Sequence, residues 1–521
     1  MLRIKPLFKK IARWHDRRAL IAGLALVYTA LFLPAILSVQ PEGLKPYVLA
    51  QLVVGSFAYS WAFFFTLRAV RPLFLLLTPL LFFASAVASY FMHAFHFEMT
   101  FQQLAVITEV QTQTALAFIT VKLVLWSLFS TFVGYRLARW CVRQEVRDPK
   151  DARVLFITCI LMLCIFTQEV GTITQRYFPY NLLFAAKGFV AEKLTLARQG
   201  DGAAEAVSYD TKKPPVTVVL IVGESVRAQN WGLNGYARQT TPLLAKRHGL
   251  INYTDVTSCF PLTRIAVPCI LTDATHEMLT PGSNSLLKIF RQMGFFTASI
   301  DMHGMSESVF GSPVSKLLND GNRLVSFNGG FLSENNVDDK GVESLRGILG
   351  EHKENLFVLF HPFGSHWPFD TRYPEKFRQF KPVCNPLHAS VLALSQDMAA
   401  CVPEELVNAY DNSILYADFI TNEVMEAVKG RAALVLYTSD HGQSLGEEGL
   451  FLHGHEKAIH ERRVPLVLWA TPEFEKHYPR GMKALRAKQH AATSHDAIFH
   501  SLLDCVGAKG NIINPKLSLC Q

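Results

Sequence analysis

The first third of the chain contains five long apolar stretches separated by shorter polar connections. The length of each stretch is close to the about 20 residues that a helix needs to cross about 30 Å of hydrocarbon. The first stretch is too long for the apolar part of a signal peptide and lacks a small-residue cleavage site. We therefore predict five membrane-spanning helices, from Ala19 to Val39, Pro46 to Leu67, Leu73 to His93, Ala115 to Leu137 and Val154 to Thr172.

Lysine and arginine residues gather on alternate sides of these stretches. They are frequent before the first stretch, between the second and third, and after the fourth. The connections 40–45 and 94–114 contain Lys45 as their only lysine or arginine. Because cytoplasmic connections carry the excess of positive charge, the N-terminus is predicted to be cytoplasmic. Five spans then place everything beyond about Thr172 outside the cytoplasm.

Beyond the spans the chain changes character twice. The segment from Phe178 to Leu196 mixes apolar residues with lysines and predicts a helix lying on the membrane surface. The segment from Gln199 to Pro215 is rich in Gly, Ala, Asp, Lys and Pro and predicts a flexible joint. We therefore expect a transmembrane domain at 1–175, an interfacial helix and linker at 176–215, and a second domain at 216–521.

Short β-branched runs alternate with helical stretches in the second domain. This pattern predicts buried, parallel strands and a doubly wound α/β domain. In such sheets the chemistry lies just beyond the carboxyl ends of the strands. The predicted strands are Val216 to Val222, Phe296 to Ile300, Leu356 to Phe360, Leu434 to Thr438 and Pro465 to Trp469.

Residues that bind metals follow three of these strands. Glu224 follows the first, the segment from His361 to His366 follows the third, and Asp440-His441 follows the fourth, with His453 further along. A lone histidine is more often structural than a ligand. However, carboxylate oxygens and imidazole nitrogens at three strand ends are the ligands that zinc prefers, so we predict a zinc site at this edge.

The segment from Thr257 to Cys269 offers the candidate nucleophiles. Cys259 and Cys269 are expected to form a disulfide because the periplasm is oxidising, which leaves Thr263 or Ser258. A hydroxyl becomes a useful nucleophile when a metal lowers its pKa or a base removes its proton.

Several ordered motifs resemble those of the lipid A phosphoethanolamine transferases, a family that includes the mobile colistin-resistance proteins. They are Val222-Gly-Glu-Ser-Val-Arg…Tyr236, Thr257-Ser-Cys, Val267-Pro-Cys269, Tyr410-Asp-Asn-Ser, Ser439-Asp-His-Gly-Gln-Ser-Leu-Gly-Glu447 and Leu452-His-Gly454. The resemblance covers essentially the whole chain. It implies a five-helix transmembrane domain and an α/β alkaline-phosphatase/sulfatase-like periplasmic domain in the bacterial inner membrane, acting as a monomer.

The resemblance also implies a reaction. Thr263 takes phosphoethanolamine from phosphatidylethanolamine and passes it to an envelope glycolipid such as lipid A or the lipopolysaccharide core, which would weaken the binding of polymyxins. Residue by residue, zinc would be bound by Glu224, Thr263, Asp440 and His441. His366 and His453 would hold a second zinc or the donor phosphate, and Glu109 and Gln111 would contact the donor headgroup.

The same matching leaves some points open. Cys384 with Cys401 matches a second family disulfide, and Cys505 with Cys520 forms a possible third. Arg264, directly after Thr263, either clamps a phosphate or faces solvent. The segment 301–311 lacks the lysine and the cysteine pair of lipid A transferases, so the acceptor stays open among lipid A, core sugars, Kdo, glucans and proteins.

Composition removes one class of function and leaves several alternatives. The net charge of +8 comes largely from basic residues beside the apolar stretches, and the 521 residues contain no nucleic-acid-binding motif. The alternatives are a phosphoglycerol transferase, a sulfatase that uses Cys259 in its C-x-P-x-R-like segment, and a phosphodiesterase. A non-enzymatic sensor or scaffold would show broken ligand positions, whereas every position that can be matched is intact.

Overall fold

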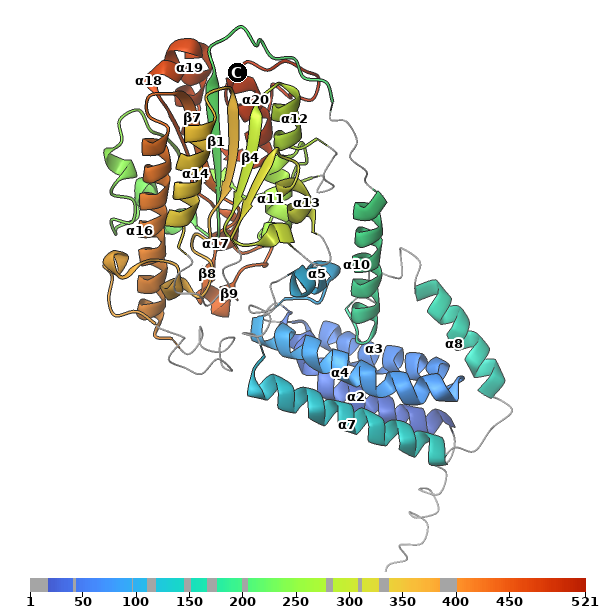
Figure 1. The fold of residues 1–521 in the computed structure, drawn as a ribbon. Helices are drawn as coiled ribbons and strands as arrows, with labels where there is room; N and C mark the ends of the chain where they lie inside the picture. Colours follow the sequence, from blue (N-terminus) through green and yellow to red (C-terminus); the bar gives the residue numbers. More distant parts are fainter. Residues whose placement is uncertain are drawn as a thin grey trace, which may run out of the picture. The chain divides into compact units, whose positions relative to one another are not determined.

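The computed structural model describes most of the chain. The described residues are 17–40, 44–95, 97–109, 119–144, 151–165, 176–198, 205–277, 284–307, 312–327, 337–384 and 401–521. They divide into two compact units, of which the first holds the described residues up to 107 and from 119 to 192. The second unit holds the described residues 108–109 and those from 193 onward (Figure 1).

Four helices of the first unit are long and apolar enough to cross a membrane, counting only the described residues. They are α2 (Arg17–Ser38), α3 (Pro46–Leu67), α4 (Arg71–Phe95) and α7 (Val121–Gln144). They match the first four predicted spans, although α7 begins and ends some residues later than predicted. The fifth predicted span corresponds in part to α8 (Asp151–Ile165), and its last residues, 166–172, lie outside the described residues.

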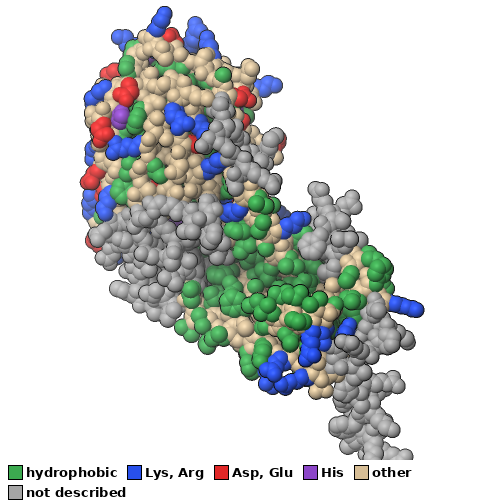
Figure 2. Space-filling model, turned by 45° about the vertical axis from the view of Figure 1, so that its right-hand side comes forward, with side chains coloured by type: hydrophobic (Ala, Val, Ile, Leu, Met, Phe, Trp, Pro, Cys, Tyr) green, Lys and Arg blue, Asp and Glu red, His purple; other side chains and the backbone are tan. Residues whose placement is uncertain are grey.

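The surface and interior of this unit both suit a lipid environment. Apolar side chains gather over its helices (Figure 2), and Leu125, Leu128 and Phe132 of α7 are more than half exposed. Inside, the Tyr28 ring packs edge-on against Phe82 with ring centroids 4.9 Å apart. Because lipid removes the hydrophobic drive between helices, such close interior packing is what holds a membrane bundle together.

Two further helices complete the first part of the chain. Helix α5 (Phe101–Glu109) forms where the sequence analysis expects only a connection, and α10 (Tyr180–Arg198) coincides with the predicted interfacial helix. The two residues predicted to contact the donor headgroup lie at and beyond the end of α5. Its last residue is Glu109, whose side chain lies outside the described residues, as does Gln111 entirely.

In its described residues the second unit is built on a seven-stranded sheet of order β2-β10-β7-β1-β6-β4-β5 (Figure 1). All five predicted strands are present, and two short edge strands, β2 and β5, add to them. The bounds are β1 (Val216–Gly223), β2 (Ile251–Tyr253), β4 (Phe296–Asp301), β5 (Arg323–Ser326), β6 (Leu356–His361), β7 (Ala432–Ser439) and β10 (Leu466–Ala470).

One predicted strand runs in the opposite direction to the expectation. β10 pairs with β7 in antiparallel register, whereas the sequence pattern predicts a parallel strand. A parallel neighbour requires a crossover back to the starting edge of the sheet. Instead the connection contains only the small β8–β9 pair (Ser444–Leu445 with Phe451–Leu452) and α17 (Ile459–Arg462), and the next strand starts where β7 ends.

Helices cover both faces of the sheet (Figure 1). Alternate residues of β1 divide between the two layers: Val218 and Leu220 face one core, and Val219 and Ile221 face the other. Burial on both faces of the sheet explains why the sequences of these strands are continuous apolar runs. The first layer contains α11 (Thr263–Leu271), α12 (Leu286–Gln292), α13 (Pro313–Leu318), α18 (Pro472–His477), α19 (Pro479–Ala487) and α20 (Asp496–Cys505), and the second contains α14 (Asp339–Glu351) and α16 (Pro403–Ala427).

Candidate active site and metal centre

The register of two central strands brings the first acidic ligands together. β1 and β7 are parallel neighbours in which Gly223 lies opposite Ser439. Glu224 and Asp440 directly follow the last residues of β1 and β7, so both leave the sheet at the same level. The backbone N–H of Asp440 donates to the carbonyl oxygen of Gly223 at 2.9 Å, which extends the ladder to this point.

Thr263 stands at the start of α11 and points its hydroxyl into this pair of strand ends. Its Oγ1 lies 3.1 Å from Glu224 Oε2 and 3.1 Å from His441 Nε2. The other candidate hydroxyl is used differently. Ser258 is fully buried and donates its hydroxyl to backbone carbonyl oxygens, including that of Asp440 at 2.6 Å. The geometry therefore favours Thr263 over Ser258 as the nucleophile.

The two carboxylates and the imidazole at these strand ends are buried, and the two acids bring like charges close together. Glu224, Asp440 and His441 are at most 1% exposed. Burial, followed by the nearby negative charge of Asp440, raises the pKa of Glu224 well above its ordinary value. Asp440 Oδ1 accepts hydrogen bonds from the backbone N–H groups of Ser225 and His441, but Oδ2 has no hydrogen-bond partner among the described residues.

These donors fit a zinc ion. The Nδ1 of His441 lies 2.8 Å from the carbonyl oxygen of Gly442, so Nδ1 carries the proton and Nε2 presents its lone pair to the site. Ligand atoms of Glu224, Asp440 and His441 all lie within 4.8 Å of one another. Two carboxylates and an imidazole, with the Thr263 hydroxyl beside them, match the oxygen and nitrogen ligands of zinc.

The two further predicted histidines lie beside this centre. The His453 ring is 4.0 Å from that of His441 and 6.1 Å from that of His366, between ring centroids. Burial, followed by the positive charge of Arg372, lowers the pKa of His366 to about 3. Burial, followed by the neighbouring histidines, also lowers the pKa of His453. Both imidazoles are therefore neutral at physiological pH, the form that binds a metal.

Arg264 is only 3% exposed, which removes the solvent-facing alternative that the sequence left open. It lies on the first turn of α11 directly after Thr263. Its burial beside Thr263 is compatible with the other alternative, a phosphate clamp.

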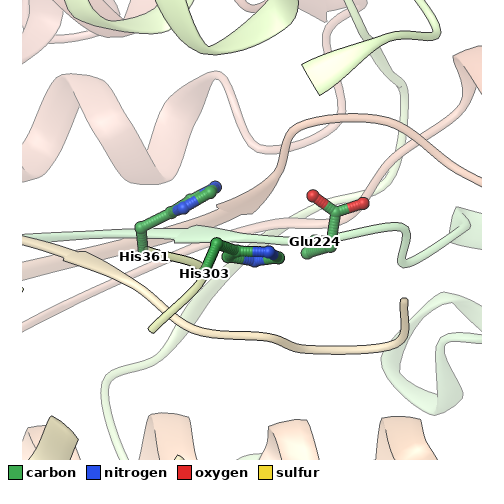
Figure 3. Close-up of side chains that lie close together, drawn as sticks. All are labelled: Glu224, His303 and His361. Atoms are coloured by element: carbon green, nitrogen blue, oxygen red, sulfur yellow. The ribbon is translucent and has the colours of Figure 1, made fainter. Parts of the chain in front are cut away.

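Two further histidines lie beside Glu224, His303 and His361, and neither was assigned a ligand role from the sequence. His303 follows β4, and His361 is the last residue of β6. Figure 3 shows both imidazoles near the Glu224 carboxylate, and their ligand atoms lie within 4.8 Å of one another. The search for ligand-type residues at strand ends found Glu224 after the first predicted strand. The same search after the second predicted strand, Phe296 to Ile300, would have found His303.

Two of the matched motifs support the ligands. The Tyr410 hydroxyl donates to the carbonyl oxygen of Ser225 at 2.6 Å and accepts from the backbone N–H of Arg227 at 2.9 Å. Asp411 accepts hydrogen bonds from the side chains of Asn230, Tyr236 and Arg238. The motif after β1 and the Tyr410-Asp motif on α16 are thus joined by hydrogen bonds. These structural contacts explain the residue types of both motifs, and no catalytic role is needed for them.

Gly364 provides the first testable prediction. Its φ is +53°, and a Cβ there would lie 2.8 Å from the backbone oxygen and 2.9 Å from the backbone nitrogen of Glu224. We expect Gly364→Ala to lower the free energy of unfolding by about 2 kcal/mol and to weaken zinc binding by displacing Glu224. Thermal unfolding and zinc content measure both effects. The control is Gly347→Ala on α14, where the Cβ meets nothing within 4 Å; equal effects of the two changes would contradict the prediction.

The structure pairs six cysteines of the second unit into Cys259–Cys269, Cys384–Cys401 and Cys505–Cys520. All three pairings agree with those that the sequence suggests. The first bridge joins the segment before Thr263 to the helix that begins at Thr263, so it braces the nucleophile. It also occupies Cys259, which a sulfatase would need to convert to its catalytic residue.

Removing this bridge should destabilise the second unit. Because the bridge closes a loop of sequence separation 10, replacing Cys259 and Cys269 by alanine should cost about 2–3 kcal/mol of unfolding free energy. Thermal unfolding of the oxidised protein measures the loss. Cys159→Ala, at an exposed free cysteine, should leave the midpoint unchanged; a double variant as stable as the wild type would show that the bridge carries no stability.

Comparisons with known proteins agree with this geometry. The sulfatase family matches residues 216–508, more than half of the chain. The chain belongs to the sulfatase family. This match covers the sheet and every strand end that contributes to the site described above.

Individual relatives are more specific. Phosphoethanolamine transferase EptA of Escherichia coli K12 is 25% identical over 459 residues, 81% of each chain. Phosphatidylethanolamine transferase Mcr-1 of Escherichia coli is 30% identical over 318 residues, 58% of this chain and 55% of Mcr-1. The solved integral membrane lipooligosaccharide phosphoethanolamine transferase A of Neisseria meningitidis has a TM-score of 0.76 and 24% identity, covering 96% of this chain and 98% of its own.

These likenesses confirm the resemblance to phosphoethanolamine transferases that the motifs indicate. The structural likeness extends over both units, so this member of the sulfatase family shares the fold of a membrane-anchored protein. Together with four apolar helices in the described residues, this makes the chain a membrane protein with an alkaline-phosphatase/sulfatase-like domain.

Proposed function

We propose that this chain is a zinc-dependent transferase that moves phosphoethanolamine from phosphatidylethanolamine to an envelope glycolipid through a phosphoethanolamine–Thr263 intermediate. The observation that carries the proposal is the position of Thr263 Oγ1, 3.1 Å from both Glu224 Oε2 and His441 Nε2. The similarity to phosphoethanolamine transferase EptA and to phosphatidylethanolamine transferase Mcr-1 supports the choice of the transferred group and its donor.

The residues divide the chemistry between them. In the first step the Thr263 hydroxyl loses its proton as Oγ1 forms a bond to the donor phosphorus, the bond to the diacylglycerol oxygen breaks, and that oxygen takes up a proton. In the second step a hydroxyl or phosphate oxygen of the acceptor forms a bond to phosphorus, the bond to Thr263 Oγ1 breaks, and Oγ1 takes up a proton. Glu224, Thr263, Asp440 and His441 would hold the zinc ion, which, when bound, lowers the pKa of the hydroxyl and polarises the phosphoryl group.

Surrounding residues prepare this reaction. Glu224 and His441 lie within hydrogen-bond distance of the Thr263 hydroxyl and orient its oxygen toward the donor. His366 and His453, both neutral, face the same centre and would contact the donor phosphate or a further metal ion. Arg264 would contribute positive charge beside the phosphoryl group.

The same proposal includes the membrane topology of the chain. We propose five spans, with α8 as the described part of the fifth, a cytoplasmic N-terminus and a catalytic domain from residue 216 in the periplasm. Three disulfides in the second unit support an oxidising compartment, and the free cysteines found in the described residues, Cys141 and Cys159, belong to the first unit. The Cys259–Cys269 bridge argues against the sulfatase alternative.

The test follows both half-reactions in turn. Detergent-purified full chain is incubated with fluorescent phosphatidylethanolamine or, as the matched donor control, fluorescent phosphatidylglycerol. Labelled diacylglycerol from the first lipid alone, lost with EDTA and restored by zinc, is the expected result. Labelled diacylglycerol from phosphatidylglycerol alone would instead favour the phosphoglycerol transferase alternative. Mass spectrometry of lipid A, core and glucan acceptors added afterwards identifies the second substrate.

A further inference from the structure

A second group of metal-ligand residues lies on the other side of Glu224 from Asp440 and His441. Its members are Glu224, His303 and His361 (Figure 3). They come from the ends of β1, β4 and β6, and in the sheet β6 lies between the other two. In the β4–β6 register Asp301 lies opposite His361, so His303 leaves β4 just beyond it. The two imidazole centroids are 4.4 Å apart.

His361 is buried without a hydrogen bond. It is 1% exposed, and neither of its ring nitrogens has a hydrogen-bond partner among the described residues. The carboxylate of Asp301 is 3.9 Å from Nδ1, which is too far for a hydrogen bond. Burying a polar group without a partner is costly, so the ring is placed for a ligand rather than for the stability of the fold.

The His303 ring is held by a hydrogen bond to the backbone. Its Nε2 lies 2.9 Å from the carbonyl oxygen of Pro362 and donates a hydrogen bond to it, which fixes the proton on Nε2. A ligand histidine commonly donates its other N–H to a carbonyl in this way. The loop after β4, which contains His303, is fixed by Asp301. The Asp301 carboxylate accepts hydrogen bonds from the backbone N–H groups of His303 and Ser306 at 3.0 and 2.9 Å.

The surrounding charges favour a cation. The carboxylates of Glu224 and Asp301 adjoin the group, and Asp338 lies under the neighbouring loop, accepting from the backbone N–H groups of Phe363 and Gly364. Arg372 brings an opposing positive charge. Its guanidinium donates to the carbonyl oxygens of His366 and Trp367 and lies 4.7 Å from the Phe363 ring.

We propose that Glu224, His303 and His361 bind a second divalent cation, zinc by preference, with the Glu224 carboxylate shared between this site and the Glu224–Asp440–His441 site. Two imidazoles and one carboxylate form a ligand set of catalytic zinc, which keeps a position open for a further oxygen. This site differs from the His366–His453 pair. It concerns metal binding alone and does not depend on the donor or acceptor of the proposed reaction.

Zinc stoichiometry of the detergent-purified full chain tests the proposal. The chain is stripped of metal, equilibrated with zinc at a buffered concentration, and analysed by inductively coupled plasma mass spectrometry. His303→Gln, which retains an N–H donor for Pro362, and His361→Gln should each bind one zinc ion fewer than the wild type. His366→Gln is measured alongside them, and the exposed surface variant His248→Gln should bind as many as the wild type. Full occupancy in the His303 variant, or loss confined to the His366 variant, overturns the proposal.

A measurement on the wild type covers the case in which the variants do not fold. Hydrogen–deuterium exchange at histidine C2, resolved by tandem mass spectrometry, is compared between metal-free and zinc-loaded protein. Zinc should slow exchange several-fold at His303 and His361 as well as at His441. Slowing at His441 with unchanged exchange at His303 and His361 would refute the second site.

Discussion

Replacing Thr263 by alanine is expected to abolish the release of diacylglycerol from phosphatidylethanolamine, lowering the rate at least about 10³-fold. The hydroxyl lies 3.1 Å from both Glu224 and His441, among the residues that would activate it as the nucleophile of the proposed reaction. In the proposed mechanism the covalent intermediate forms on this hydroxyl, so the intact mass of the alanine variant should show no phosphoethanolamine adduct after incubation with donor.

Two matched variants make this result specific. Thr263→Ser keeps the oxygen and should retain measurable activity and an adduct. Ser258→Ala removes the other hydroxyl, which binds backbone carbonyls, and should retain most of the rate in whatever fraction is folded. If Thr263→Ala keeps more than about a tenth of the wild-type rate, or if Ser258→Ala alone loses the adduct, the nucleophile is wrongly assigned.

Replacing Glu224 by glutamine is expected to have opposite effects on stability with and without metal. Zinc binding to the native state stabilises it, by about 4 kcal/mol at a zinc concentration about 1,000 times Kd. The variant should lose most of this gain because the proposed zinc shell loses a charged ligand. The metal-free variant should nevertheless unfold at a higher temperature than metal-free wild type at about pH 8, because it lacks the buried charge next to Asp440.

The pH dependence follows from the direction of the pKa shift. Burial and the charge of Asp440 raise the pKa of Glu224 in the folded protein. The folded state therefore holds the proton more tightly than the unfolded state, and stability is lost as pH rises from the ordinary glutamate pKa through the raised one. Differential scanning calorimetry of metal-free protein between about pH 5 and pH 8 should show this loss in the wild type and a flatter profile in Glu224→Gln.

An exposed acid provides the control for this experiment. Glu351 is paired with Arg323 at the surface, with a side chain 57% exposed, and Glu351→Gln should reproduce the wild-type profile. If zinc raises the unfolding temperature of Glu224→Gln as much as that of the wild type, Glu224 does not bind the metal. If the metal-free pH profiles of Glu224→Gln and wild type coincide, the buried charge is neutralised by another group.

Local pattern alone determined much of this protein. The apolar stretches located four spans because a membrane span needs only length and hydrophobicity, which a sequence states directly. The buried strands were found for a similar reason, since burial on both faces produces uninterrupted apolar runs. Glu224 and Asp440 could then be placed at one edge because parallel strands share the level of their carboxyl ends.

Tertiary structure decided what depends on residues far apart in the chain. The antiparallel direction of β10 follows from the path of the connection after β7, which no local periodicity records. Whether His303 and His361 meet depends on the register of β4 against β6, and the burial of Arg264 depends on how α11 packs. Pairing and packing arise from contacts between segments distant in sequence, so composition and spacing could name the ligand types but not which of them lie beside Glu224.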